Sequence, residues 1–172
     1  MGPAVHVSII VPVLNEAAGI GAALQALAPF RASGHEVIVV DGGSDDATAQ
    51  LALAGADRVL TAPRGRARQM NAGAAVAHGG VLLFLHADTV LPADAVSAIQ
   101  RALAAGARWG RFDVRISGGA MVFPAIAALM NLRSRLTGIA TGDQAMFMTR
   151  AAFDAVDGFP DQPLMEDIEM SK

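Results

Sequence analysis

The chain has 172 residues, 53% of them hydrophobic, and a formal net charge of −3, which suits one domain with a sizeable core and argues against a nucleic-acid partner. It has no cysteine, which excludes disulfide frameworks, zinc–thiolate sites and thiol catalysis. Neither a secretory signal sequence nor a transmembrane helix is predicted, because no basic region precedes the first apolar run and no window of about eighteen apolar residues exists, so we expect a soluble, cytoplasmic protein.

Strands and helices are predicted to alternate along the first two thirds of the chain. Short runs of apolar and β-branched residues predict strands at 7–13, 36–40, 58–61 and 81–85. Helical spacing and terminating residues predict helices from about 20 to 29, at 47–54, at about 64–77 and at 93–105. This alternation, with connections of a few residues, predicts right-handed crossovers and a mainly parallel sheet.

The pattern changes after Gly106. Residues 109–116 alternate apolar and charged side chains, which predicts a half-exposed, antiparallel strand. An apolar helix at 121–136, a strand at 145–149 and a short helix at 151–156 are expected next. The apolar helix suits a buried core position, or a face turned to a partner or to a membrane surface. Residues 164–172 resemble a helix start without a stop signal, so we expect the natural chain to continue.

Polar residues gather where three of the predicted parallel strands end. The groups are Asn15 with Glu16, the segment 41–46, and His86 with Asp88. The carboxyl ends of parallel strands share one edge of the sheet, where α/β proteins bind ligands. Acidic groups crowded there repel one another unless a cation or a hydrogen-bonding ligand compensates. Asp88 could hold a hard cation and, through it, a diphosphate, or could simply cap the helix that follows.

Three arginines, Arg64, Arg66 and Arg68, open the third predicted helix, where they either face phosphate or form a solvated helix start. Common alternative motifs are absent from the sequence. The single lysine, Lys172, fits no Walker A loop, and Leu24 breaks the only approach to a G-x-G-x-x-G fingerprint. No G-x-S-x-G elbow occurs, and the four histidines lack metal-ligand spacing.

Four motifs, in order and at suitable separations, make the chain resemble the family 2 glycosyltransferases of GT-A fold over essentially its whole length. VSIIVPVLNE is similar to the family's first strand, and VIVVDGGSDDAT to its Asp-Asp-Gly-Ser-x-Asp-x-Thr segment, which recognises the base. FLHADT stands at the D-x-D motif, and MED at the late Glu-Asp pair that supplies the catalytic base. GRARQMNAG, FLHADT and GDQAMF also resemble a bacterial subgroup associated with radical-SAM and selenium-related genes.

The resemblance implies a three-layer α/β/α sandwich, mainly parallel in its N-terminal part and mixed in its C-terminal part. It implies a single domain, 1–172, with a nucleotide-sugar part at 1–106 and an acceptor part at 107–172. The implied activity is inverting transfer of a hexosyl or related sugar from a nucleoside-diphosphate sugar to an acceptor hydroxyl. The donor and acceptor identities and the oligomeric state are left open.

The resemblance also implies roles for single residues. Those expected at the nucleotide sugar are Pro12, Asn15, Glu16, Asp41, Gly43, Arg68, Asn71, His86 and Ala87. Those expected on the acceptor side are Gly142, Asp143 and Gln144. Asp88 would hold Mg²⁺ or Mn²⁺ together with the diphosphate, and Asp167, oriented by Glu166, would be the catalytic base.

One departure from the family pattern concerns the metal. His86 replaces the first D-x-D aspartate, and a neutral imidazole suits magnesium poorly, so Asp88 is expected to be the only carboxylate on the ion. Metal affinity without nucleotide should therefore be low. Two alternatives remain: a non-catalytic nucleotide-sugar-binding module, and a nucleotidyltransferase. The latter is disfavoured because Leu14-Asn15-Glu16 stands where a Gly-rich basic loop belongs.

Overall fold

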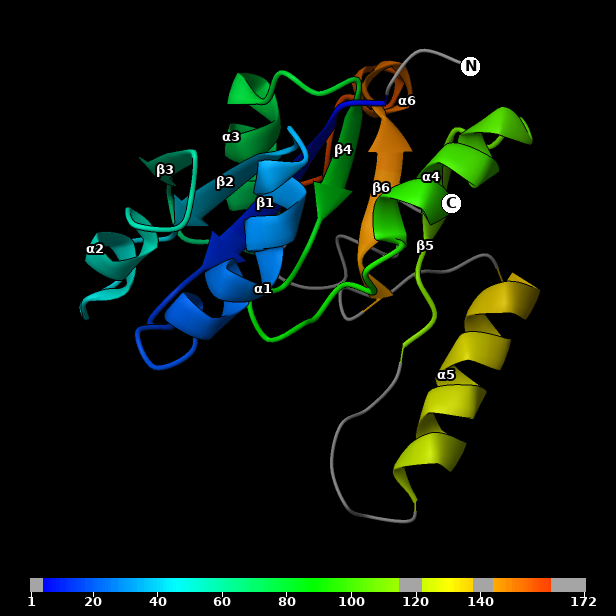
Figure 1. The fold of residues 1–172 in the computed structure, drawn as a ribbon, viewed down its shortest axis with the longest axis horizontal. Coiled ribbons are helices and arrows are strands. Elements are labelled where there is room, and N and C mark those ends of the chain that lie inside the picture. Colours follow the sequence, from blue (N-terminus) through cyan, green and yellow to red (C-terminus); the bar gives the residue numbers. More distant parts are fainter. Residues whose placement is uncertain (1–4, 115–121, 138–143, 162–172) are drawn as a thin grey trace.

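The computed structural model describes residues 5–114, 122–137 and 144–161. The first part alternates strands and helices, as predicted: β1 (Val7–Val13), α1 (Ile20–Ala32), β2 (Glu36–Asp41), α2 (Thr48–Ala52), β3 (Arg58–Thr61), α3 (Arg66–Val76), β4 (Val81–Phe84) and α4 (Ala95–Ala104). The second part adds β5 (Trp109–Arg111), α5 (Phe123–Thr137), β6 (Met146–Thr149) and α6 (Arg150–Ala155) (Figure 1).

The strands form one sheet in the order β3-β2-β1-β4-β6-β5. The pairs β3–β2, β2–β1 and β1–β4 are parallel, and β4–β6 and β6–β5 are antiparallel. The predicted parallel N-terminal part and mixed C-terminal part are both confirmed.

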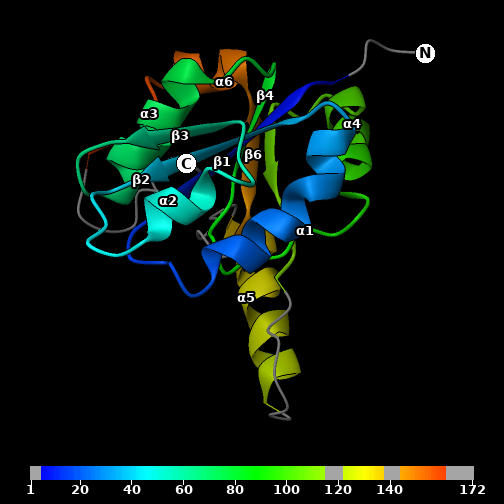
Figure 2. The same ribbon diagram turned by 60° about the vertical axis from the view of Figure 1, so that its left-hand side comes forward.

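Alternate residues of each strand face opposite layers, so two cores form. On one face, Ile9, Val11 and Leu83 of the sheet pack with Leu24 of α1 and Ile99 of α4. On the other face, the intervening strand residues pack against α3 and α6. This core includes Ile10, Val40 and Phe84 of the sheet, Met70 of α3 and Phe153 of α6. Figure 2 shows these helices on the two sides of the sheet, which confirms the α/β/α sandwich.

Helix α3 lies close to the sheet at Gly73. A Cβ atom placed there would come within 2.5 Å of Ile10 Cγ2 and 3.0 Å of Val40 Cγ2. Only glycine permits α3 to approach β1 and β2 this closely.

Helix α1 continues through Pro29 to Ala32, so the prediction that it stops near Pro29 was wrong. Proline removes one backbone donor, but burial of Phe30, which is 8% exposed, against the core favours a further turn. Ser33 then closes the helix, because its backbone N–H and its hydroxyl both donate to the Pro29 carbonyl.

The strand predicted at 109–116 is shorter: β5 ends at Arg111. The backbone N–H of Phe112 donates to the Gln144 carbonyl at 2.8 Å. The Asn131 side chain accepts from Val114 N at 2.9 Å and donates to Val114 O at 3.0 Å. These bonds pair the Phe112 N–H and both backbone groups of Val114 outside a regular strand ladder.

Helix α5 does not occupy the buried core position that its apolar sequence allowed. It extends away from the sheet (Figure 2). Three of its large apolar side chains, Ile126, Leu129 and Leu132, are exposed, and so is Val122 just before the helix. None of the helices in the described ranges is long and apolar enough to span a membrane.

A buried polar cluster lies at the edge of the sheet where the parallel strands begin. Glu36 is 8% exposed and accepts hydrogen bonds from Ser8 Oγ at 2.6 Å and from the His78 backbone N–H at 3.0 Å. Burial alone would raise the pKa of Glu36, but these bonds outweigh it and lower the pKa below 4.5. The pKa of His35 is lowered below 6.5 by burial and then by the nearby His6.

We therefore expect acid to destabilise the fold in two steps. His35 resists protonation when folded, so stability is lost as the pH falls below 6.5. Glu36 contributes stability that is present above pH 4.5 and is lost as the pH falls through its lowered pKa. Melting temperatures measured between pH 8 and about pH 2 cover both steps, with His35→Gln expected to remove the upper one. An unchanged upper step in His35→Gln would contradict the assignment.

Candidate nucleotide-sugar site

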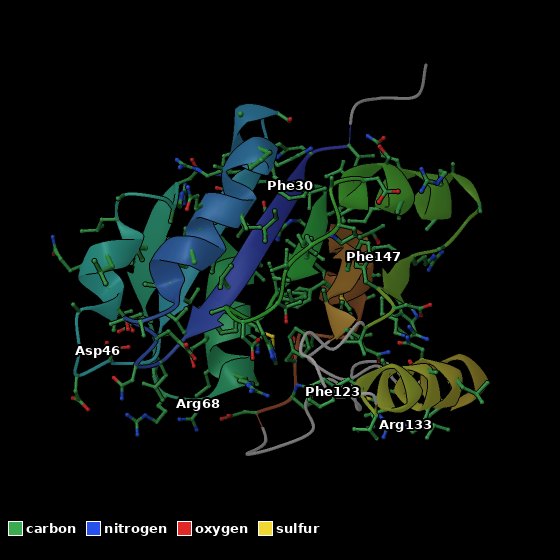
Figure 3. The ribbon with its side chains drawn as sticks, turned by 60° about the horizontal axis from the view of Figure 1, so that its bottom comes forward. Phe30, Asp46, Arg68, Phe123, Arg133 and Phe147 are labelled. Atoms are coloured by element: carbon green, nitrogen blue, oxygen red, sulfur yellow. The ribbon has the colours of Figure 1, made fainter. Side chains whose placement is uncertain are left out.

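The candidate site is a cleft at the carboxyl edge of the sheet, between β1 and β4. The chain passes from β1 to β2 on one side and from β3 to β4 on the other, so the connections diverge at this point, where α/β folds place ligands. The cleft has a volume of about 330 Å³ and is lined by Pro12, Val13, Leu14, Glu16, Arg64, Gly65, Arg66, Gln69, His86, Ala87 and Asp88. In Figure 3, β1 points to this edge between the labelled Asp46 and Arg68.

Five of the predicted site residues lie together in this cleft. Pro12 comes from the end of β1 and Glu16 from the loop after it, and the loop after β4 supplies His86, Ala87 and Asp88. Asp88 does not cap the helix that follows, because α4 begins at Ala95 with Asp94 at its N-cap. The alternative reading of Asp88 as a helix cap is therefore wrong.

The loop after β1 is fixed to the loop after β2. Asn15, in a left-handed conformation with φ 55°, accepts from Asp45 N at 2.9 Å, and its own N–H donates to Ser44 Oγ at 2.9 Å. The Glu16 N–H donates to Thr48 Oγ1 at 2.7 Å. Asn15 therefore positions the cleft wall and is not among the cleft-lining residues.

Asp41 lies at the end of β2, as predicted, but is not among the cleft-lining residues. Its side chain is buried, and its carboxylate accepts from Gly43 N at 3.1 Å, Ser44 N at 2.9 Å and the Ser44 hydroxyl. Gly43 thus serves this turn. The base-recognition role of Asp41 and Gly43 stays a prediction.

Two predicted nucleotide residues on α3 contact the chain after α6 instead of lining the cleft. Arg68 forms a bidentate ion pair with Asp161, with Nε to Oδ1 at 2.9 Å and Nη2 to Oδ2 at 2.9 Å. The Asn71 side chain donates to Phe159 O at 2.8 Å and accepts from Phe159 N at 2.9 Å. Phe159 itself packs edge-on against Phe84.

Arg64 and Arg66, rather than Arg68, line the cleft, at the start of α3. Neither side chain forms a hydrogen bond or an ion pair with another residue of the described ranges. No side chain caps this helix start, whose free N–H groups favour an anion. The cleft therefore combines carboxylates from the loops after β1 and β4 with cationic groups at the start of α3.

Gln69 also lines the cleft and was not predicted from the sequence. It lies one turn into α3, is 4% exposed, and donates from Nε2 to Val13 O at 2.9 Å and to Val40 O at 2.8 Å. It links the ends of β1 and β2.

Of the residues predicted on the acceptor side, the structure describes Gln144. Gln144 is buried, and its carbonyl accepts from Phe112 N beside β5. Gly142, Asp143, Glu166 and Asp167 lie outside the described residues, so their roles stay predictions.

The cleft could hold a divalent cation only with help from a ligand. Within the described ranges, no three His, Asp or Glu side chains gather closely enough to bind a metal ion by themselves. Mg²⁺ commonly binds one or two carboxylates and completes its shell with substrate phosphate and water. Asp88 at the cleft fits that pattern, in which the ion binds with a diphosphate.

The family described as Glycosyl transferase family 2 matches residues 8–153 of the sequence. The chain belongs to this family. A sequence search of curated proteins gave no match. The subgroup associated with radical-SAM genes stays a prediction.

Solved structures share the GT-A fold. The mannosyltransferase PcManGT from Pyrobaculum calidifontis, in complex with GDP-Man and Mn²⁺, is 23% identical to this chain, with a TM-score of 0.75. The match covers 98% of this chain and 51% of the PcManGT chain. TarS 1-349 from S. aureus is 21% identical, with a TM-score of 0.73, and the match covers 96% of this chain and 54% of the TarS chain. Glucosyl-3-phosphoglycerate synthase from M. tuberculosis is 20% identical, with a TM-score of 0.71, and the match covers 96% of this chain and 64% of the synthase chain. The chain thus spans about half to two thirds of these relatives.

Proposed function

We propose that this family 2 domain transfers a sugar from a nucleoside-diphosphate sugar to an acceptor hydroxyl with inversion. One observation carries the proposal: Glu16, Asp88, Arg64 and Arg66 converge on a single cleft at the point where the sheet's connections diverge. Such a mixed set of charges suits a sugar nucleotide whose diphosphate is bridged by a cation. Relatives solved with GDP-Man and Mn²⁺, or with UDP and Mg²⁺, support this donor class.

In the proposed complex, the arginines and the start of α3 bind the diphosphate, and Pro12, Glu16, His86 and Ala87 surround the nucleoside and sugar. Asp88 would hold Mg²⁺ or Mn²⁺, which offsets negative charge on the leaving diphosphate. The acceptor oxygen attacks the anomeric carbon as the bond from that carbon to the diphosphate oxygen breaks. The diphosphate leaves with the electron pair, and the proton passes to Asp167, which Glu166 orients.

The remaining assignments belong to the same proposal. Residues 1–106 would form the donor part and residues 107–172 the acceptor part, with Gly142, Asp143 and Gln144 on the acceptor side. The transferred group would be hexosyl or related, and the site of action cytoplasmic.

A thermal-shift screen of nucleoside diphosphates, each with and without Mn²⁺, tests the donor class. A ligand that binds only the folded state raises the melting temperature, and the largest shift is expected with one nucleotide and Mn²⁺ together. No shift with any nucleotide would refute the proposal. A non-catalytic binding module, which His86 at the D-x-D position would suit, predicts the same shifts but no release of nucleoside diphosphate from the donor.

We expect Arg64→Ala with Arg66→Ala to weaken binding of the preferred nucleoside diphosphate by at least about tenfold, because charge-assisted hydrogen bonds to phosphate are lost. Calorimetry at low and high salt checks this, since screening should shrink the difference. Arg101→Ala on α4, which removes an arginine paired with Asp94 and away from the cleft, is the control. An equal loss in both proteins would contradict a specific phosphate contact.

A further inference from the structure

The Gln69 amide is held in one orientation at the base of the cleft. Both of its Nε2 hydrogens are used, on Val13 O and on Val40 O, the carbonyls near the ends of two neighbouring strands. Its remaining polar atom, Oε1, accepts no hydrogen bond from the residues of the described ranges. A buried acceptor without a partner is costly, so a ligand that donates a hydrogen to Oε1 gains a directed interaction.

The amide also occupies the space beside the end of β2 where a side chain would otherwise project. A Cβ atom at position 42 would lie 3.0 Å from Gln69 Cδ and Oε1 and 3.1 Å from Nε2. Gly42 is therefore the residue that admits Gln69. The neighbouring Asp41 carboxylate turns into its own loop, toward Gly43 and Ser44. At the β2 end, the polar group that lines the cleft thus comes from α3.

We propose that Gln69, in place of Asp41, recognises the nucleoside of the donor. Oε1 accepts a hydrogen bond from an N–H of the base or from a ribose hydroxyl, and the two strand carbonyls fix its direction. The inference rests on the proposed function and deepens it. An acceptor that is oriented before binding loses little freedom when the ligand arrives, and it penalises ligands that lack the matching donor.

Calorimetry with Gln69→Met tests this in the presence of Mn²⁺. Methionine keeps the length of the side chain and removes the amide. The probes are a panel of nucleoside diphosphates, their 2′-deoxy analogues and inorganic pyrophosphate. We expect the affinity for the preferred nucleotide to fall about tenfold or more, with pyrophosphate affinity unchanged. Loss of the base ranking identifies a base N–H as the donor, and loss of a preference for the ribo form identifies the ribose hydroxyl.

Gly42→Ala is a second variant that keeps the amide. Gly42 has no left-handed φ, so alanine suits the backbone, and the new Cβ displaces Gln69 by a few tenths of an ångström. It should weaken the selectivity among nucleotides in the same direction as Gln69→Met. It replaces Gln69→Met in the experiment if that variant shows no cooperative melting transition. Asp41→Asn should leave the nucleotide ranking intact.

Three results would overturn the inference while the proposed function stands. One is an equal loss of pyrophosphate and nucleotide affinity in both Gln69→Met and Gly42→Ala, which indicates a structural role alone. The second is an unchanged base ranking together with an unchanged preference for the ribo form in both variants. The third is loss of the base ranking in Asp41→Asn. Absence of nucleotide binding by the unaltered protein would instead refute the proposed function, and the inference with it.

Discussion

Asp88→Asn is expected to abolish the metal-dependent part of nucleotide binding. Asp88 is the carboxylate that the loop after β4 contributes to the cleft, and no cluster of three ligating side chains is available within the described ranges to replace it. Asparagine keeps the shape but loses the charge that a hard cation requires. In Mn²⁺, the dissociation constant of the preferred nucleoside diphosphate should rise on the order of 100-fold, or about 2.8 kcal/mol, toward its value without metal.

Calorimetric titrations with Mn²⁺ and with a chelator, on the unaltered protein and the variant, provide the measurement. Asp94→Asn is the matched control, because it makes the same charge change on the same connection at an exposed position paired with Arg101. The control should keep the full difference between the two titrations. Undiminished metal-dependent binding by Asp88→Asn would remove Asp88 from the metal site.

The sequence predicts the sheet well because hydrophobic burial fixes it locally. The runs that became β1, β2 and β4 are buried on both faces, as expected for central strands covered by helices on both sides. The end of α1 could not be read in the same way. Pro29 is a local stop signal, and burial of Phe30 overrides it through contacts with distant residues.

Side-chain directions at the site were harder to predict than strand ends. Arg66 and Arg68 differ by about 200° around a helix, so one faces the cleft when the other faces away, and only the register of α3 decides between them. Asp41 is at the predicted strand end, but a local turn with Ser44 captures its carboxylate. Gln69 acts on carbonyls 56 and 29 residues away, a relation that no local pattern reveals.

Asp167→Asn is expected to spare donor binding and to prevent transfer. In the proposed mechanism the donor is bound by the cleft, whereas Asp167 acts only on the proton of the attacking hydroxyl. A carboxylate is a weak base toward a free alcohol, but proton loss becomes favourable as the new bond forms, so the carboxylate contributes mainly in the transition state. The amide cannot accept that proton, and general-base catalysis of this kind typically contributes about 10²- to 10⁴-fold.

The measurement is the rate at which nucleoside diphosphate is released from the donor selected in the screen, with water as the acceptor until the natural acceptor is identified. The dissociation constant for the donor should stay unchanged in Asp167→Asn, and the rate at saturating donor should fall by the factor above. Asp154→Asn, an exposed carboxylate of α6 outside the cleft, should retain both values. A normal release rate in Asp167→Asn would mean that another group takes the proton. A parallel loss of donor affinity would place Asp167 in the donor site, because a residue that acts only on the acceptor hydroxyl has no contact through which to change it.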